Sequence, residues 1–358
     1  MIDCYYRIRS LHIAGIKIHL HAYEYGRSHS KEIEAFCSSV NYYPRDISSK
    51  RQFSLLPYSV VSRRSDQLLT NLLKDVYPIL FDGIQTTIFL DDPALAERTK
   101  AVRIHNIEPR YYNTLARYEK NIARKLYYFI EALRLWKYEK ILKKSQYLMT
   151  VSIVDHEYYN SRFHNSVLIP SSHPYDSVGC TEGTGDFVLY HGDLSVNENV
   201  AVTEFLISRV FSKIPFQCII SGKKPPENLK AIISKYSNIK LVPDPGTDTM
   251  DNLIRNAHIN VIPTMETNGL KLKLLISLFC GRHCIVNSTT INGSGLYSLC
   301  HIADTGEKMV QKITGLMGKP FTQEMIEERR KILVKNHDNK VNAARLIRLL
   351  FPEFEKHV

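Results

Sequence analysis

Strands and helices alternate regularly along residues 187–286, and this alternation restricts the fold more than any other feature of the sequence. The expected strands are 187–192, 216–222, 239–242, 259–263 and 284–286, and the expected helices are 200–211, 227–235, 250–257 and 271–279. Strands that alternate with helices at this spacing form a parallel sheet with crossover helices on its faces. We therefore predict an α/β domain whose ligands lie beyond the carboxyl ends of the strands.

The first half of the chain has a looser α/β pattern. A helix is expected over 2–14, strands over 16–22, 76–81, 86–90 and 147–152, and a long helical tract over 111–147. The stretch 171–185 is rich in Ser, Pro and Gly, which is the composition of a linker. Because 358 residues exceed what one core usually organises, we expect two Rossmann-like domains, 1–172 and 173–358, facing a cleft.

Three loops of the second domain are expected to meet at one edge of its sheet. They follow Gly192, Gly222 and Pro263 at the ends of neighbouring strands. Glycine lets the backbone approach a ligand closely, and Gly269 allows a turn that points N–H groups at a phosphate from the start of a helix. Lys271 adds positive charge there. The alternative is that the glycines are ordinary turns and the lysines a solvated surface.

The segment 263–282, PTMETNGLKLKLLISLFCGR, resembles the donor-binding segment of retaining glycosyltransferases of family 4, or group 1, which have the GT-B architecture. Those proteins have a proline-ended strand, a Gly-containing loop and a helix ending in glycine before another strand. The segments 190–195 and 221–224 match the two upstream loops of the family, so the resemblance covers essentially all of 187–290. More loosely, 103–108 matches a strand that ends in a histidine facing the donor sugar.

The resemblance implies a role for each matching residue. Glu266 corresponds to the first acid of the paired-glutamate motif, near the sugar hydroxyls, and His105 lies across the cleft near the reacting carbon. Lys271 and Lys223 stabilise the departing diphosphate. The other implied donor-binding residues are Gly192, Asp193, Gly222, Val242, Asn268, Gly269 and Leu270. The architecture usually works without a metal, so no metal site is expected, and no cofactor besides the nucleotide diphosphate sugar that serves as donor substrate.

Three departures from the family pattern are visible. Ile276 stands where the second glutamate of the family binds the ribose hydroxyls, and an aliphatic side chain accepts no hydrogen bond. Asp193 and Glu198 stand where many members have an Arg and a Lys for phosphate. The chain begins at the first helix of the family, so the first strand is expected to be missing. These departures leave open a catalytically impaired sugar-nucleotide-binding or scaffold protein of the same fold.

The chain is basic, with a net charge of +11, so an anionic partner is expected. Residues 110–144 interleave Lys and Arg with Tyr, Phe and Trp, as in helices that lie on an anionic membrane, where lipid-linked acceptors are found. A core-packing aromatic stripe with a basic outer face is the alternative. A basic membrane-associated protein whose long helix matters more than its cleft therefore also stays open. Nucleic acid is a poor candidate because no base-stacking motif is present.

Several other classes are disfavoured. The seven scattered cysteines indicate reduced thiols, and the start of the chain lacks the apolar core of a secretory signal, so the cytoplasm is expected, with peripheral binding to the inner face of the membrane as an option. Cys280 with Cys284, and His19 with His21, lack further ligands at zinc-site spacing. A serine hydrolase and a Rossmann oxidoreductase lack their glycine motifs.

The combined prediction is a metal-independent glycosyltransferase that acts in polysaccharide biosynthesis. It would transfer a sugar, with retention, from a nucleotide diphosphate sugar to a glycan, lipid-linked or other acceptor. A hexosyltransferase is expected, of a kind similar to mannosyltransferases.

Overall fold

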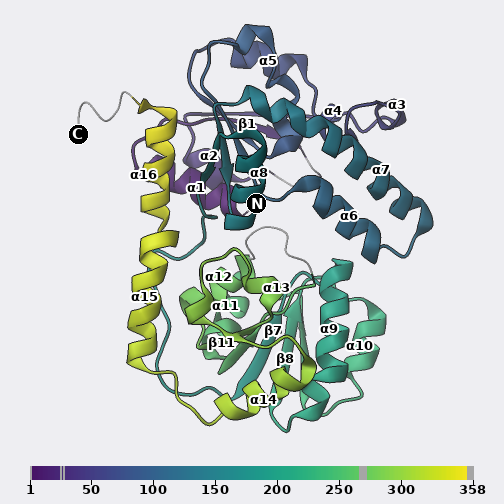
Figure 1. Cartoon of the computed structure of the whole chain (residues 1–358), viewed down its shortest axis with the longest axis vertical. Coiled ribbons are helices and arrows are strands. Elements are labelled where there is room, and N and C mark those ends of the chain that lie inside the picture. Colours follow the sequence, from purple (N-terminus) through teal and green to yellow (C-terminus); the bar gives the residue numbers. More distant parts are fainter. Residues whose placement is uncertain (1, 25, 27–28, 266–271, 353–358) are drawn as a thin grey trace. The chain divides into compact units, whose positions relative to one another are not determined.

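The structure is a computed structural model that describes residues 2–24, 26, 29–265 and 272–352. The chain forms two compact units (Figure 1). One runs from the N-terminus to Ser172 and also includes helix α16 (Asn339–Leu350); the other runs from His173 to Asp338. Among the described helices, none is long and apolar enough to cross a membrane.

The elements of the first unit, with 3-10 helices written η, are α1 (Ile2–Ile13), β1 (His19–Tyr23), α2 (Lys31–Ala35), β2 (Ser39–Tyr43), α3 (Ser49–Gln52), α4 (Tyr58–Val61), α5 (Asp66–Leu72), β3 (Ile79–Asp82), η1 (Ile84–Phe89), η2 (Pro93–Leu95), β4 (Lys100–Ile104), α6 (Glu108–Tyr118), α7 (Ile122–Tyr138), η3 (Glu139–Lys144), β5 (Tyr147–Thr150), α8 (Ile153–Phe163), β6 (Ser166–Leu168) and α16. Strands β3, β4, β5 and β6 form a parallel sheet in that order, and β1 pairs with β2 in a separate parallel sheet. Strand β4 is buried along its whole length and ends directly before His105.

The predicted strand over 86–90 is wrong, because residues 86–89 lie within the 3-10 helix η1 and Leu90 is its C-cap residue. Gly83 adopts a left-handed conformation, with φ of 98°, and turns the chain out of β3. The hydroxyls of Thr86 and Thr87 then donate to carbonyls three residues back, at 2.9 and 2.7 Å. Such local hydrogen bonds compete with strand pairing, so they override the β propensity of the sequence.

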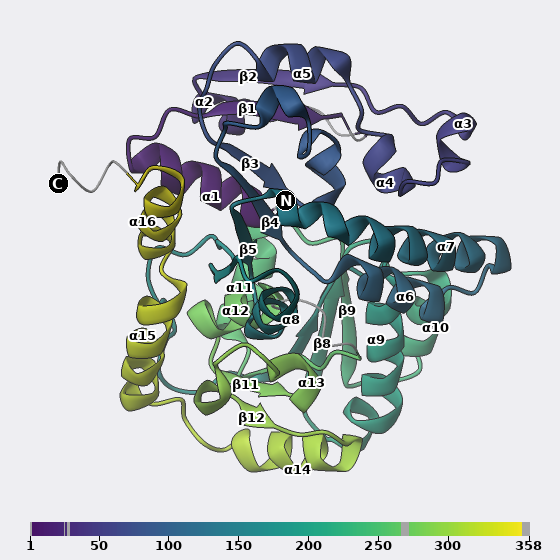
Figure 2. The same ribbon diagram turned by 45° about the horizontal axis from the view of Figure 1, so that its top comes forward.

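The expected helical tract 111–147 is divided into α6, α7 and η3. Glu119 has an extended backbone and its carboxylate accepts from the N–H of Asn121 at 2.9 Å. The side chain of Asn121 in turn caps α7 by accepting from the N–H of Arg124 at 3.0 Å. Figure 2 shows α6 and α7 side by side as a helical hairpin.

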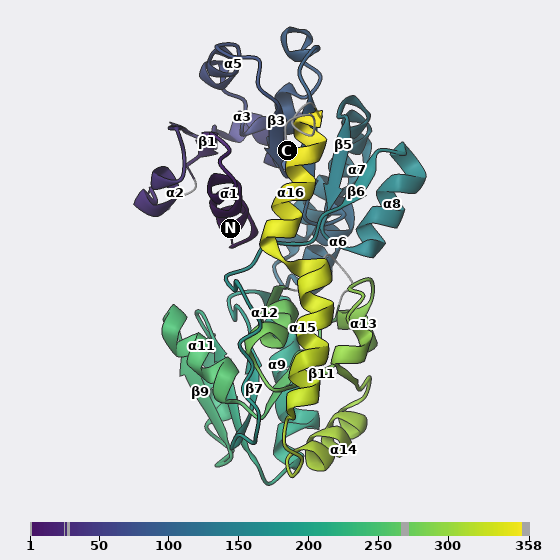
Figure 3. The same ribbon diagram turned by 90° about the vertical axis from the view of Figure 1, so that its left-hand side faces the viewer.

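Helix α16 belongs to the core of the first unit, although the sequence assigns these residues to the second domain. It lies beside α1 (Figure 3), and its side chains Ala343 and Leu346 share an apolar cluster with Leu11 of α1 and Met149 of β5. Apolar surface on α16 is therefore buried by residues far away in the sequence, which a pattern along the chain does not reveal.

The elements of the second unit are β7 (Phe187–His191), α9 (Asn197–Arg209), η4 (Phe211–Lys213), β8 (Gln217–Gly222), α10 (Glu227–Ile233), β9 (Ile239–Pro243), α11 (Thr247–Asn256), β10 (Ile259–Val261), α12 (Leu272–Cys280), β11 (His283–Val286), α13 (Ser288–Ile291), η5 (Tyr297–Leu299), β12 (His301–Ile302), α14 (Gly306–Leu316) and α15 (Gln323–His337). The predicted alternation of strands and helices is confirmed, with bounds that shift by a few residues.

The sheet of the second unit is parallel, with the order β12-β11-β10-β7-β8-β9. Apolar side chains of α9, α10 and α14 share one core with β7 and β8. The chain winds outward from β7 to β9 in one direction and from β10 to β12 in the other. The direction of winding therefore reverses between β7 and β10, which is the position where open α/β sheets bind ligands.

Candidate functional site

In the second unit, the loops after β7 and β8 touch each other at the carboxyl edge of the sheet. A Cβ atom at position 222 would lie only 1.9 Å from the carbonyl oxygen of Gly192. At Gly192 itself, the nearest atom to an added Cβ would be Cγ of Asn199, at 3.4 Å. Glycine is thus required at 222 by the neighbouring backbone, while a side chain at 192 would meet only ordinary contacts.

Asp193 shapes the loop that leads into α9. Its Oδ1 accepts from the N–H of Ser195 at 3.0 Å and from the Ser195 hydroxyl at 2.6 Å. Its carbonyl oxygen accepts from the side-chain amide of Asn199 at 2.9 Å. The carboxylate therefore stabilises a turn, which gives a structural reason for an acid at a position where the family resemblance implies a phosphate contact.

The loops after β8 and β9 hold two residues in left-handed conformations. Lys224 and Asp244 have φ of 48° and 47°. The N–H of Lys224 donates to Oδ1 of Asp244 at 2.8 Å, and the N–H of Asp244 donates to the carbonyl of Gly222 at 2.9 Å. Backbone strain of this kind persists where surrounding contacts fix it and is frequent at ligand sites. Lys223 and Val242 lie directly beside these residues, Lys223 exposed and Val242 half-buried.

The exit from β10 is fixed by Asn287, which caps helix α13. Its side-chain amide donates to the carbonyl of Thr264 at 2.7 Å, and its Oδ1 accepts from the N–H groups of Thr264 and Thr290 at 3.2 and 3.1 Å. This clamp anchors the start of the loop expected to bind the donor. Glu266, Asn268, Gly269, Leu270 and Lys271 lie outside the described residues.

Lys273, in the first turn of α12, brings a cation to the position between β7 and β10. Its Nζ lies 3.4 Å from Oδ1 of Asn199 in α9 and 5.2 Å from the ring centroid of Tyr190 in β7. Burial and, to a smaller extent, the charge of Lys273 together lower the pKa of His191 to about 3, so this imidazole is neutral at pH 7. Lys273 belongs to the segment 263–282 that resembles a donor-binding segment. The sequence, however, predicted Lys271 as the residue that binds the diphosphate.

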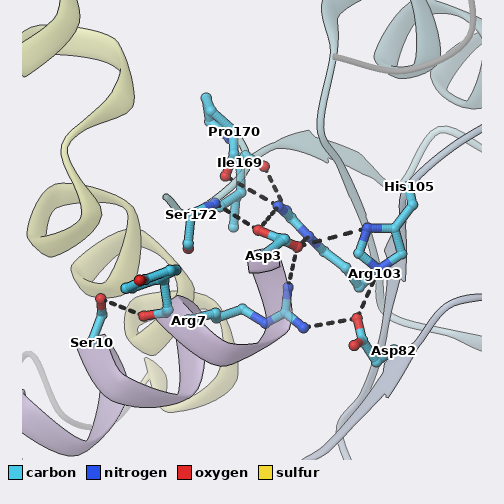
Figure 4. Close-up of polar contacts among 10 residues, drawn as sticks. Asp3, Arg7, Ser10, Asp82, Arg103, His105, Ile169, Pro170 and Ser172 are labelled. Atoms are coloured by element: carbon cyan, nitrogen blue, oxygen red, sulfur yellow. Dashed lines mark hydrogen bonds and ion pairs between the residues drawn. The ribbon is translucent and has the colours of Figure 1, made fainter. Parts of the chain in front are cut away.

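A second cluster of charged side chains lies in the first unit, at the ends of β3 and β4 (Figure 4). Asp82 ends β3, and its Oδ1 accepts from Nη2 of Arg7 at 2.7 Å and from Nε2 of His105 at 2.9 Å. Asp3 accepts from Arg7 at 2.6 Å and from Nε and Nη2 of Arg103, both at 3.1 Å. Helix α1 thus contributes the acidic residue Asp3 and the basic residue Arg7 to the cluster at the strand ends.

Backbone groups around this cluster bond to Arg103 and Asp3 as well. The guanidinium of Arg103 is fully buried and donates to the carbonyls of Ile169 and Pro170, at 2.5 and 3.1 Å. The N–H of Ser172 donates to Oδ1 of Asp3 at 2.6 Å. Figure 4 shows these groups converging on Asp3 from several segments. Buried charges that are paired and hydrogen-bonded in this way hold a fixed arrangement.

The ionised carboxylate of Asp82 orients the imidazole of His105. Burial alone would raise the pKa of Asp82, but Arg7 and His105 outweigh burial and hold this pKa well below its usual range. The same balance, with Arg103 and Arg7 as the cations, holds the pKa of Asp3 below its usual range. An ionised Asp82 only accepts hydrogen bonds, so Nε2 of His105 carries a proton and points at Asp82. The imidazole side chain is 35% exposed and accessible to a ligand.

Sequence reasoning identified His105 but not Asp3, Arg7, Asp82 or Arg103. Two signals were present in the sequence: Asp3 and Arg7 are four residues apart on one helix face, and Asp82 is followed by Gly83 at the end of a strand. Within the described ranges, no group of three His, Cys, Asp or Glu side chains is arranged to hold a metal ion. His19 and His21 instead bond to the hydroxyls of Ser39 and Tyr43, each at 2.8 Å.

Comparisons with known proteins agree with this architecture. The sucrose-phosphate synthase of Thermosynechococcus elongatus superimposes with a TM-score of 0.70 at 14% identity, over 98% of this chain and 92% of that chain. The Anabaena protein HepE, in complex with UDP and glucose, superimposes with a TM-score of 0.67 at 10% identity, over 99% of this chain and 96% of that chain. A glycosyltransferase from Rickettsia africae superimposes with a TM-score of 0.63 at 12% identity, over 100% of this chain and 96% of that chain.

The chain has the GT-B fold. No protein-family model matches the sequence. The chain is 26% identical to an uncharacterised 44.6 kDa protein in the cps region of Klebsiella pneumoniae, over 285 residues that make up 74% of this chain and 71% of that protein. At these identities the solved structures establish the fold, and the activity has to be argued from the residues.

Proposed function

We propose that the protein is a glycosyltransferase that uses a nucleotide diphosphate sugar. The observation that carries the proposal is the cation of Lys273 beside β7, at the position where the winding of the sheet reverses. The loops after β7 and β8 touch each other at the same edge of the sheet, and the left-handed residues Lys224 and Asp244 lie in the loops after β8 and β9. A diphosphate needs cations and backbone N–H groups, and helix starts at the carboxyl edge of a parallel sheet supply both. The fold shared with HepE, whose structure contains UDP and glucose, supports this proposal.

In this proposal the second unit binds the donor. Lys273, Lys271 and Lys223 stabilise the charge that develops on the departing diphosphate, so that no metal is required. Glu266 contacts the sugar hydroxyls, and the loop that follows Val242 contacts the base. The other donor contacts remain those the resemblance implies: Gly192, Asp193, Gly222, Asn268, Gly269 and Leu270.

The first unit, in the same proposal, supplies His105 for the reacting sugar and the site for a glycan or lipid-linked acceptor. Asp82 orients the imidazole and stabilises positive charge on it, which helps to balance negative charge that forms during transfer. We further propose retention at the anomeric carbon, a hexosyl donor of the kind mannosyltransferases use, and a cytoplasmic role in polysaccharide biosynthesis. The relative from Klebsiella, named for its place in a cps region, is the comparison that bears on this role.

A thermal-shift panel of UDP, GDP, ADP and their sugars tests the donor site. At ten times its dissociation constant, a ligand that binds only the folded state adds about 1.4 kcal/mol of stability. We expect one nucleotide to stabilise the protein and Lys273→Ala to weaken its binding about tenfold or more, because a charge-assisted contact is lost. Lys240→Ala, which removes an exposed lysine from β9, is the matched control. No stabilisation by any nucleotide would remove the proposal.

Ile276 supports a second candidate, a sugar-nucleotide-binding protein without turnover. This half-buried residue of α12 stands where the resemblance places the acid that binds ribose. Turnover separates the two candidates, because an enzyme releases nucleoside diphosphate from the donor when acceptor is present. In an enzyme, His105→Ala lowers kcat by about a hundredfold or more while nucleotide binding is retained. Binding without release would establish the second candidate.

A further inference from the structure

Helix α7 presents an apolar stripe to solvent. The exposed residues are Ile122, Leu126, Phe129, Leu133 and Trp136, which alternate in steps of four and three residues and therefore line one side of the helix. Ile122 is 84% exposed and Trp136 is 56% exposed. An amphipathic helix of a globular unit normally turns its apolar side to the core, so this outward stripe needs an explanation.

The outward orientation of the stripe is fixed by a buried acid on the opposite side of α7. Glu131 is fully buried, and its two carboxylate oxygens accept from the backbone N–H groups of Tyr58 and Ser59, at 3.0 and 2.8 Å. Leu135 and Tyr138 on the same side are buried in the core of the unit. Rotating the helix to bury the stripe would pull the buried carboxylate of Glu131 from its two donors and leave it unpaired, which is strongly unfavourable.

The surroundings of the stripe carry positive charge. Glu131 is the one acid between residues 122 and 138, and it points inward, whereas Lys125 and Lys137 flank the stripe and are exposed. Beside the helix, Arg134 donates to the carbonyl of Gln52 at 2.9 Å and holds a loop whose Phe53 and Leu55 are 86% and 95% exposed. Apolar and cationic side chains thus occur together on this part of the first unit.

We propose that α7 and the loop 53–56 bind an anionic lipid membrane, with the apolar stripe at the boundary between headgroups and acyl chains and the lysines on the lipid phosphates. Surface helices that bind membranes combine an apolar side with flanking Lys and Arg. Charge complementarity selects this occupant over a second copy of the chain, because two such helices would bring like charges together. The inference rests on α7 and the adjoining loop 53–56 and is independent of the proposed transfer reaction.

Trp136 is the only tryptophan of the chain, so its fluorescence reports on this surface without any label. The full-length protein is mixed with vesicles of phosphatidylcholine alone, or of phosphatidylcholine with phosphatidylglycerol, at low and high salt. We expect a blue shift of the emission with the anionic vesicles, loss of the shift at high salt, and quenching by lipids brominated on their acyl chains. An unchanged emission maximum with anionic vesicles at low salt would overturn the proposal.

Two pairs of substitutions separate the apolar and electrostatic contributions. Leu126→Glu with Leu133→Glu, and Lys125→Glu with Lys137→Glu, should each lower the partition into anionic vesicles about tenfold or more. Both pairs lie on exposed positions, so the fold is retained, and Val76→Glu, at an exposed residue away from α7, is the matched control. A blue shift that grows with protein concentration in the absence of lipid would show self-association instead and would also overturn the proposal.

Discussion

Among the described glycines of the second unit, Gly222 leaves the least room for a Cβ atom. The sequence singled it out as a place where a ligand approaches the chain, but the nearest neighbour is the carbonyl of Gly192 in the adjacent loop. The same glycine therefore has a structural function, since it allows the loops after β7 and β8 to pack together. Only after this contact is made can the two loops form one site.

Gly222→Ala tests this contact. The added methyl would lie 1.9 Å from a backbone oxygen, so the loops must move apart, and we expect a loss of roughly 3 kcal/mol, at the upper end of overpacking effects. Gly315→Ala is the control, because Gly315 lies in helix α14 with nothing within 4 Å of an added Cβ. That substitution should stabilise the protein by about 0.5–1 kcal/mol. Urea unfolding measures both, and equal effects would contradict the role of the loop contact.

Among the elements, the carboxyl end of β10 depends on a side chain from a different segment. Asn287 bonds to both backbone groups of Thr264 and caps α13. We expect Asn287→Ala to cost roughly 3 kcal/mol, because a cap is lost and backbone groups of Thr264 lose their partner. In the proposed function, nucleotide affinity should fall as well. Urea unfolding and nucleotide titration check this, with the exposed Asn292→Ala as control; an unchanged affinity would show that the clamp does not position the loop.

In other elements, hydrogen bonds between nearby residues explain why the pattern of apolar residues predicted the wrong structure. The β-rich letters of 86–90 form a 3-10 helix because two threonine hydroxyls bond to nearby carbonyls, and the tract 111–147 breaks where Glu119 and Asn121 make a cap. Both the 3-10 helix and the helix break can be predicted from the sequence when these residues are treated as hydrogen-bonding groups. Periodicity alone misses them, because it records only which residues are apolar.

For the whole molecule, the two units should respond differently to acid. Burial lowers the pKa of His283 and His337, both in the second unit, to about 4. An unfolded histidine has a pKa of about 6.5, so between about pH 6.5 and 4 the unfolded state binds more protons and stability falls as the pH falls. Each group contributes at most about 1.4 kcal/mol per pH unit. The lowered pKa values of Asp3 and Asp82, in the first unit, cost stability only below about pH 4.

Hydrogen exchange at pH 7 and pH 5, corrected for intrinsic rates, measures this difference. We expect the strands β7 and β11 to lose more protection on acidification than β4 and β5. His283→Gln removes one of the titrating groups and should reduce the dependence of stability on pH in this range. In the first unit, burial lowers the pKa of the histidine His21. Equal loss of protection in the two units would therefore contradict the expectation that the buried histidines of the second unit make it more sensitive to acid.

The sequence by itself determined the α/β class and the order of elements in the second unit. These features follow from local periodicity and turn residues, which each segment carries within itself. The strand that ends before His105 was implied by the family resemblance and not by periodicity. Only the tertiary structure decided that α16 packs on α1, that Asp3 and Arg7 reach Asp82 and Arg103, and that the apolar side of α7 faces outward. Such facts depend on which distant segments become neighbours, and burial and charge pairing fix those neighbours only when the chain is folded.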